Sequence, residues 1–385
     1  MKCRLLFILF FSLFLNEFSY AESPNLPLSL REEIGQMLVI GFNGKTITKD
    51  SLITKIIDKS NIGGVILFDY NVATKTYDKN IESPEQVKKL TTDLEHLNYL
   101  ANLKHHRPQL PLLISVDYEG GKVNRLKERY GFPVTKTAAE VAKLPLDEAD
   151  REAETMAETL QNSGLNLDFA PVVDVNVNPD NPVIGKFERS FSAEPQQVAN
   201  YAHLFSKQFL NHNVQCAYKH FPGHGSSTAD SHLGFVDVTD TWQNYELLPY
   251  EMLLNGNQAC GMIMTAHVVN RQLDKTGLPA TLSYDILTNL LRKQLKFNGV
   301  IITDDMQMKA ISDHYGLEQA LTLAINAGAD MFIFGNQLVD NLQDPEEIIN
   351  IIEAKVKSGE ISRARIDEAY QHILAFKKTL QTNYA

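Results

Sequence analysis

The segment at residues 219–225, with the sequence KHFPGHG, combines side chains that suit chemistry better than a hydrophobic core. It places a lysine and two histidines around two glycines and a proline, and Asp230 and His232 follow shortly after it. The glycines and the proline rule out a continuing helix, so the backbone can turn tightly and direct these side chains towards one point. The apolar run before the segment, 214–218, is typical of a buried strand. We therefore expect the lysine and the first histidine to leave the carboxyl end of a strand and to begin a functional loop.

Asp230 and His232 have the spacing of an acid–base pair. A carboxylate two residues away can fix the tautomer of an imidazole and raise its basicity, which makes the histidine a usable general acid or base. His224, between two glycines, fits a hydrogen-bonded structural role as well as a catalytic one.

A zinc site formed by His220, His224 and His232 is an alternative reading of the same loop. The first two have the i,i+4 spacing of a zinc-binding helix, but the Phe-Pro-Gly between them breaks such a helix. We therefore expect neither a metal nor an organic cofactor.

Carboxylates also follow two other apolar runs. Asp304 and Asp305 end the run 299–303, and a buried strand that ends in two carboxylates is a strong chemical signal. Asp305 is expected to cap the helix that follows. Asp117 ends the run 112–116, where it either belongs to the site or caps the next helix.

These strings resemble glycoside hydrolase family 3, and in particular its bacterial β-N-acetylglucosaminidases of peptidoglycan recycling. The similarity extends from about Ile34 to Gly335. In IGKFERSF this chain has a short insertion relative to the family pattern I-G-x-R-S-F, and a tyrosine stands where the family often has glutamine in DYEGGKVNR. The resemblance rests on KHFPGHG with ADSH (219–225 and 229–232), DYEGGKVNR (117–125), IGKFERSF (184–191) and DDMQM (304–308).

The resemblance implies a role for individual residues. Asp304 would be the catalytic nucleophile, and His232 with Asp230 would be the general acid/base. Glu119, Asp168 and Asp174 would be structural, and His267 would line the site. The sugar-binding residues implied by the match are Asp117, Arg125, Arg189, Lys219, His220 and Met308.

The elements that must position these residues are continuous apolar runs separated by helical patterns. Such runs mark strands covered on both faces, as in a parallel sheet, and eight of them indicate a single (β/α)₈ TIM-type barrel. In that fold site residues sit just after the strands, as they do here. Long loops are expected over 71–111 and 176–197. The eight runs are 37–42, 64–68, 112–116, 167–173, 214–218, 261–265, 299–303 and 331–334.

Residues 1–21 are typical of a secretory signal peptide, because Lys2 and Arg4 precede an apolar run that ends in Ser-Tyr-Ala. An uncleaved anchor is the alternative. We predict a periplasmic or secreted protein in which residues 22–385 form the catalytic barrel.

Cys216 and Cys260 fall in expected buried strands, where cysteine usually acts as a small apolar residue, although an oxidising compartment would permit a disulfide.

The composition narrows the choice of partners. A formal net charge of −11 argues against nucleic acid and anionic membranes as binding partners.

We predict a monomeric, retaining, exo-acting β-N-acetylglucosaminidase that releases terminal N-acetylglucosamine from peptidoglycan fragments or from chitin oligosaccharides. The alternatives are a phosphorylase that transfers the sugar to phosphate and a non-catalytic sugar-binding protein.

Overall fold

A computed structural model describes residues 27–77 and 79–380 of the chain. The signal peptide expected at residues 1–21 lies outside the described residues. Among the described residues, no helix is long and apolar enough to cross a membrane.

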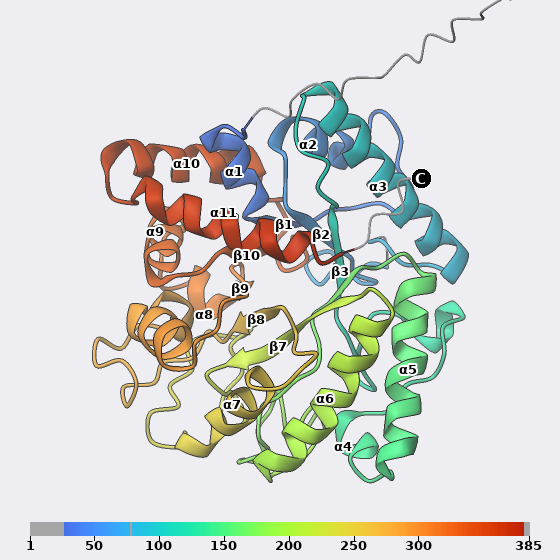
Figure 1. Cartoon of the computed structure of the whole chain (residues 1–385), viewed down its shortest axis with the longest axis vertical. Helices are drawn as coiled ribbons and strands as arrows, with labels where there is room; N and C mark the ends of the chain where they lie inside the picture. Colours follow the sequence, from blue (N-terminus) through green and yellow to red (C-terminus); the bar gives the residue numbers. More distant parts are fainter. Residues whose placement is uncertain (1–26, 78, 381–385) are drawn as a thin grey trace, which may run out of the picture.

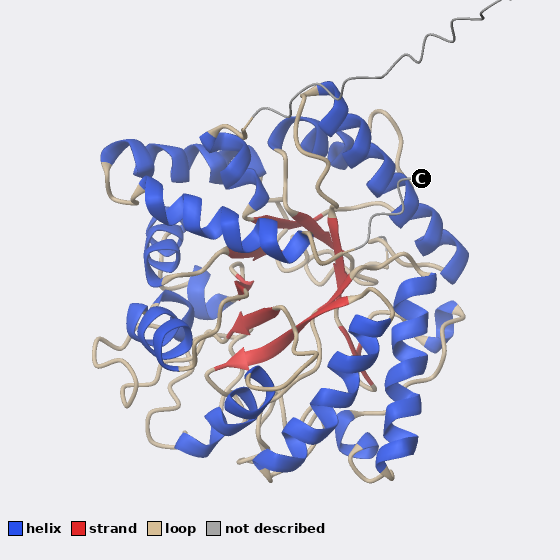
Figure 2. Cartoon of the chain, in the orientation of Figure 1, coloured by secondary structure: helices blue, strands red, loops and turns tan. Residues whose placement is uncertain are grey.

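Eight parallel strands close into a barrel in the order β1-β2-β3-β6-β7-β8-β9-β10, which confirms the predicted (β/α)₈ fold. Figures 1 and 2 show these strands at the centre of a ring of helices. The barrel strands are β1 (Leu38–Gly41), β2 (Gly64–Ile66), β3 (Leu113–Val116), β6 (Leu167–Asp168), β7 (Gln215–Phe221), β8 (Met262–Thr265), β9 (Val300–Asp305) and β10 (Met331–Phe334).

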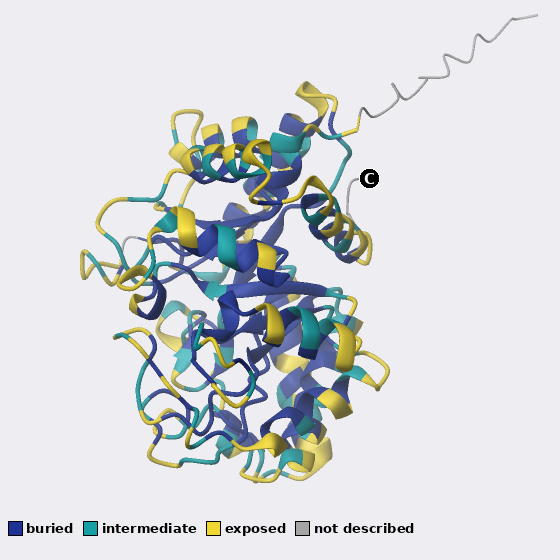
Figure 3. Ribbon diagram, turned by 90° about the vertical axis from the view of Figure 1, so that its left-hand side faces the viewer, coloured by how far each residue is buried: buried dark blue, intermediate teal, exposed yellow. Residues whose placement is uncertain are grey.

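The helices cover the outside of the barrel, and the antiparallel hairpin β4 (Tyr118–Gly120) and β5 (Val123–Asn124) follows β3. In Figure 3 the strands are buried and the exposed residues lie on the outer turns of the helices and in the loops. The helices are α1 (Leu30–Gln36), α2 (Leu52–Ser60), α3 (Pro84–Lys104), α4 (Ala138–Val141), α5 (Leu146–Asn162), α6 (Pro195–Asn211), α7 (Leu248–Leu254), a π-helix (Asp285–Gln294), α8 (Lys309–Ser312), α9 (Leu317–Ala327), α10 (Pro345–Ser358) and α11 (Arg363–Lys377).

β6 and β7 differ most from the sequence prediction, whereas the ends of the other barrel strands agree with it within two residues. β6 ends at Asp168 rather than continuing to Val173, because Pro171 has no N–H group to donate to a neighbouring strand. β7 is longer than expected and reaches Phe221, so Lys219 and His220 lie in the strand rather than after it.

The expected loop 71–111 is wrong over half of its length, because α3 occupies residues 84–104. Ser83 caps this helix by accepting a hydrogen bond from the backbone N–H of Gln86 at 3.1 Å, and Pro84 takes the first turn, where its missing N–H costs nothing. The buried residues of α3 recur at helical spacing, as in Val87, Leu90 and Leu94. The second expected loop is shorter than predicted, because α6 begins at Pro195.

Cys216 and Cys260 form a disulfide, which corrects the expectation of two separate thiols. Cys216 lies in β7 and Cys260 stands just before β8, and the parallel register pairs Ala217 with Met262. This register brings the two Cα atoms to 4.9 Å, within the range of disulfides.

Replacing both cysteines with alanine is expected to lower the free energy of unfolding by up to about 4 kcal/mol, because the cross-link restricts the unfolded chain over a loop of this size. The bonded residues are 44 positions apart. Urea unfolding of the double variant and of the wild type, both without reductant, measures the difference. Added reductant should bring the wild type to the variant's midpoint. Equal midpoints without reductant would show that the two cysteines are not bonded in the folded protein.

Candidate active site

A cavity of about 250 Å³ opens at the carboxyl ends of the barrel strands. It brings together every side chain proposed from the sequence for catalysis or sugar binding. β3, β7 and β9 deliver Asp117, Lys219 with His220, and Asp304, and the connecting loops deliver the others. The predicted residues that line the cavity are Asp117, Arg125, Arg189, Lys219, His220, Asp230, His232, Asp304 and Met308.

A network of buried and half-buried charges lines the cavity. Lys219 Nζ lies 3.0 Å from Asp117 Oδ1 and 2.7 Å from Glu119 Oε1. Arg189 donates two hydrogen bonds of 2.7 Å to the carboxylate of Glu119, one from Nε and one from Nη2. Arg125 Nη2 lies 3.5 Å from Asp117 Oδ2. Cations and carboxylates therefore alternate and hold each other in place, which fixes the donors that face the cavity.

Both carboxylate oxygens of Glu119 are occupied by this network. Burial alone would raise its pKa, but the charges of Arg189 and Lys219 outweigh burial and hold the pKa of Glu119 far below its ordinary value. Glu119 is therefore ionised and has no proton to donate, as expected of a structural carboxylate.

Asp174 fixes the orientation of the His220 ring. The Nδ1 atom of His220 lies 2.7 Å from Asp174 Oδ2, and since a carboxylate accepts, Nδ1 carries the proton. The Nε2 atom of His220 is then a lone-pair site, and it lies 3.3 Å from Arg189 Nη2, which donates to it. Asp174 also accepts the backbone N–H of His224 at 2.8 Å, so it holds both ends of the turn between the two histidines.

His224 has a structural role in this loop rather than a catalytic one, and the sequence had left both roles open. It is buried and does not line the cavity. Its Nε2 atom lies 3.3 Å from Ser231 Oγ, so the ring packs beneath the loop that carries Asp230 and His232. Burial lowers the pKa of His224 to about 4, which keeps its ring neutral.

Asp230 and His232 form the expected pair. Asp230 Oδ1 accepts hydrogen bonds from the backbone N–H of His232 at 2.9 Å and from its Nδ1 at 2.8 Å. Nδ1 is thus the protonated nitrogen towards Asp230, and Nε2 is free to exchange a proton with a substrate. His232 is partly exposed, and its desolvation inside the cavity would lower its pKa, but the hydrogen bond to Asp230 and the charge of Asp304 raise it. The loop rests on α8, because Ser231 O accepts the N–H of Ala310 at 3.2 Å.

Asp304 stands in the cavity as an ionised carboxylate. Burial alone would raise its pKa, but the neighbouring His267, His220 and His232 and the N–H of Asp305 outweigh burial and lower it. The N–H of Asp305 donates to Asp304 Oδ1 at 2.7 Å and so fixes the orientation of the carboxylate.

Asp305 does not cap the next helix, contrary to the sequence prediction. Its Oδ1 accepts the N–H groups of Gln307 at 3.0 Å and of Gly335 at 3.3 Å, so it ties the end of β9 to the end of β10. The helix α8 begins only at Lys309 and has Met308 at its N-cap position. β9 ends at Asp305, two residues beyond the predicted run 299–303, so Asp305 belongs to the end of the strand rather than to the start of the helix.

His267 was expected to line the site, but it is buried beneath the cavity wall. Its Nε2 donates to the backbone carbonyl of Asp305 at 3.0 Å, and its Nδ1 lies 2.7 Å from Thr281 Oγ1. His267 therefore supports the strand end that carries Asp304.

Several lining residues were missed by the sequence reasoning. Gln337 and Leu338 follow the eighth apolar run, so the rule that site residues come after strands could have found them. Phe68 was counted within the second run, 64–68, but β2 ends at Ile66 and leaves it beyond the strand. Lys122 lies within the motif DYEGGKVNR, but the sequence comparison assigned it no role in the site. Phe187 lies in the insertion within IGKFERSF, where the family pattern offers no matching position.

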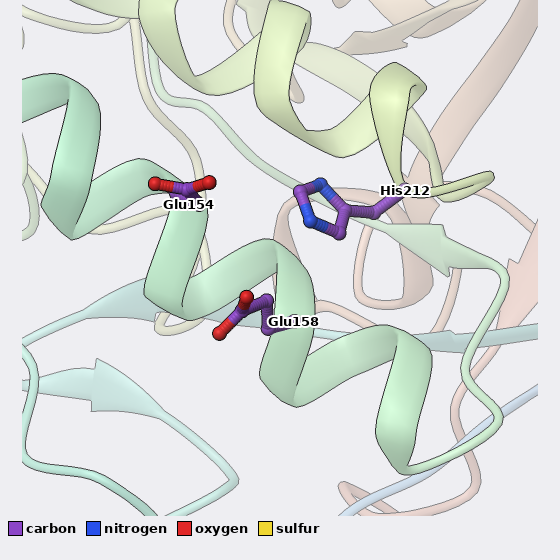
Figure 4. A group of neighbouring side chains, drawn as sticks. All are labelled: Glu154, Glu158 and His212. Atoms are coloured by element: carbon purple, nitrogen blue, oxygen red, sulfur yellow. The ribbon is translucent and has the colours of Figure 1, made fainter.

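Potential metal ligands gather away from this cavity. Within the described part of the chain, one group has three ligand atoms within 4.8 Å of one another: Glu154 and Glu158 of α5 with His212 at the end of α6. Figure 4 shows these side chains between the two outer helices. His212 precedes β7, at the end of the barrel opposite the cavity, and both glutamates are exposed. The three histidines of the suggested zinc site, His220, His224 and His232, do not form such a group among the described residues.

Known proteins resemble this chain over most of its length. The model of the glycosyl hydrolase family 3 N-terminal domain matches residues 29–376. β-Hexosaminidase A of Pseudoalteromonas piscicida is 33% identical over 343 residues, which cover 81% of this chain and 54% of that protein. The β-hexosaminidase LpqI of Mycobacterium tuberculosis is 30% identical over 371 residues, covering 93% of this chain and 86% of the relative.

Solved structures agree with these sequence relatives. A family 3 β-N-acetylglucosaminidase from Paenibacillus has a TM-score of 0.79 at 32% identity and covers 92% of this chain. A β-N-acetylhexosaminidase from Beutenbergia cavernae has a TM-score of 0.79 at 28% identity, covering 91% of this chain and 99% of the other. The chain spans only 54% of the Pseudoalteromonas protein and 63% of the Paenibacillus chain. The match to the family model over 29–376, on a barrel with these motifs at its carboxyl end, shows that the chain belongs to glycosyl hydrolase family 3.

Proposed function

We propose that the chain is a retaining, exo-acting β-N-acetylglucosaminidase. The observation that carries this proposal is the shared cavity of Asp304, an oriented and ionised carboxylate, and His232, a histidine whose Nε2 is free and whose Nδ1 is held by Asp230. The family membership and the β-hexosaminidase names of the relatives support the choice of sugar.

The terminal sugar would occupy the closed floor of the cavity. Asp117, Arg125, Arg189, Lys219 and His220 would hold its hydroxyl groups there, and Met308 would pack against it. Because the charged groups already fix one another, they lose little freedom when the sugar binds, which favours a defined orientation. Buried strand residues such as Ile66, Met264 and Ile333 line the cavity, and side chains fill the interior of such a barrel. A substrate would therefore enter by its chain end, which supports exo action.

The reaction would proceed by double displacement. The carboxylate of Asp304 attacks the anomeric carbon while the bond to the leaving oxygen breaks, and His232 Nε2 gives its proton to that oxygen. A water molecule then attacks the same carbon, His232 Nε2 takes a proton from it, and Asp304 departs as a carboxylate. Asp230 keeps the imidazole in the right tautomer and stabilises its charged form throughout.

We also propose that the protein is exported and acts on peptidoglycan fragments, with chitin oligosaccharides as the alternative substrate. The leader-like residues 1–21 and the disulfide between Cys216 and Cys260 support export, because disulfides persist in oxidising compartments.

Turnover of an aryl N-acetyl-β-glucosaminide beside the matching aryl β-glucoside tests the proposal. The assay contains a chelator and is run with and without phosphate, with the sugar product identified. We expect free N-acetylglucosamine in both buffers and much slower release from the glucoside. No turnover of either substrate, a preference for the glucoside, or a sugar phosphate as the main product would contradict the proposed function.

A further inference from the structure

The mouth of the cavity is defined by three exposed side chains. Of all the residues that line the cavity, only Lys122, Phe187 and His232 are exposed, whereas the others are buried or half-buried. The floor is closed by the packed barrel, so exposed lining residues mark the opening to solvent. The proposed general acid and Phe187 therefore share the same end of the cavity.

The turn that carries Phe187 is held firmly in place. The N–H of Glu188 donates to Gly185 O at 2.9 Å, and the N–H of Ala139 donates to Glu188 O at 3.2 Å. Lys122 also binds the turn, since its Nζ donates to Lys186 O at 3.1 Å and lies 3.3 Å from Glu188 Oε2. Lys122 is thus an anchor of the turn, and Phe187 is the large apolar side chain left exposed at the mouth.

The phenyl ring of Phe187 is not needed to fill the hydrophobic core, because the residue is 44% exposed although its backbone is held in place. A rigid aromatic side chain beside a polar cavity offers a large apolar contact surface at low entropic cost. One face of a pyranose presents C–H groups and can pack on such a ring.

We propose that the turn 185–188 forms the subsite for the leaving group and that Phe187 packs against the sugar next to the bond that is cleaved. The inference rests on the proposed function: the leaving oxygen must reach His232, so the group attached to it emerges at the mouth, where Phe187 stands. The substrate class that fits is a β-linked oligosaccharide whose second residue is a pyranose. This assigns a specificity-determining role to a residue of the insertion.

Competition between two acceptors tests this subsite on a common intermediate. An aryl N-acetyl-β-glucosaminide forms the glycosyl-enzyme, which is then offered methanol and methyl N-acetyl-β-glucosaminide together. In either transfer the acceptor hydroxyl attacks the anomeric carbon, gives its proton to His232, and displaces Asp304. The ratio of the two transfer products does not depend on how fast the intermediate forms.

Phe187→Ala is expected to lower the ratio of sugar transfer to methanol transfer by about three- to tenfold, the usual worth of an aromatic contact. Phe187→Tyr keeps the ring and should stay within about twofold of the wild type. Tyr284→Ala removes an aromatic side chain of similar exposure, 51%, outside the cavity, and should leave the ratio unchanged.

A second measurement compares kcat/KM for N,N′-diacetylchitobiose with that for methyl N-acetyl-β-glucosaminide, and Phe187→Ala should lower this ratio by the same factor. Ratios that stay at the wild-type value in Phe187→Ala would overturn the subsite while leaving the glycosidase intact. A wild-type protein without turnover of the aryl substrate would instead overturn the proposed function, and the subsite with it.

Discussion

Replacing Asp304 with alanine is expected to reduce kcat by a factor on the order of 10⁴ to 10⁶ for every leaving group, because the substitution deletes the nucleophile itself. The folded structure should survive, since within the described part of the chain the Asp304 side chain accepts a single hydrogen bond, from the adjacent Asp305 N–H. Steady-state turnover of aryl substrates with different leaving groups measures the loss. Asp313→Ala, which removes an exposed aspartate just after α8, is the matched control and should keep wild-type rates.

Small anions provide a second readout for this variant. With the carboxylate gone, azide can enter the space next to the anomeric carbon and displace an aryl leaving group directly. We expect azide to restore part of the turnover and to yield the α-glycosyl azide, because a single displacement inverts the centre. A variant that keeps most of its activity without azide, or a β-azide product, would remove Asp304 from the nucleophile's role.

The effect of His232→Ala should depend on the leaving group. An aryl group departs as a stable phenolate and needs little protonation, so the first step should slow only slightly. A sugar alkoxide needs the proton, and the loss there should be roughly 10² to 10⁴, the usual worth of general acid catalysis. Asp230→Ala should show the same pattern more weakly, since it removes only the partner that orients and charges the imidazole.

Pre-steady-state rates of glycosylation, plotted against leaving-group pKa, give this dependence directly. The slope should steepen in His232→Ala. His96→Ala, which removes an exposed histidine of α3, is the control and should keep the wild-type slope. If the slope of His232→Ala equals that of the wild type, the histidine is not the acid.

The pH dependence of kcat/KM should also reflect the protonation of His232. Desolvation inside the cavity would lower the pKa of His232, but the hydrogen bond that His232 donates to Asp230 and the charge of Asp304 raise it, so the acid stays protonated above the ordinary pH range of histidine. For a sugar leaving group, kcat/KM should therefore fall only at pH values above that range. Asp230→Ala should move this alkaline limb to lower pH. An unmoved limb would show that another group sets it.

Much of the fold could be predicted because the barrel strands are apolar on both faces. Runs such as 299–303 and 331–334 stand out as continuous hydrophobic segments, and the structure has strands at all eight predicted runs. Asp117 and Asp304 could be located by the same reasoning, since site residues follow the strands of such a barrel.

The remaining features depend on contacts between distant segments. The disulfide follows from the register between β7 and β8, which places Cys216 near Cys260, and no local pattern encodes that register. The hydrogen bond between the side chains of Arg189 and Glu119 joins residues that are 70 positions apart in the sequence. Phe187 lies in an insertion, so only the assembled cavity shows that it stands at the same mouth as His232.

The most direct test of the account is the configuration of the sugar that is released first. Proton NMR during the first minutes of hydrolysis of an aryl N-acetyl-β-glucosaminide resolves the two anomers before they interconvert. Double displacement through Asp304 predicts that β-N-acetylglucosamine appears first and that the α-anomer grows in later by mutarotation. An α-anomer that appears first would mean a single displacement by water, and would contradict both the covalent intermediate and the role of Asp304.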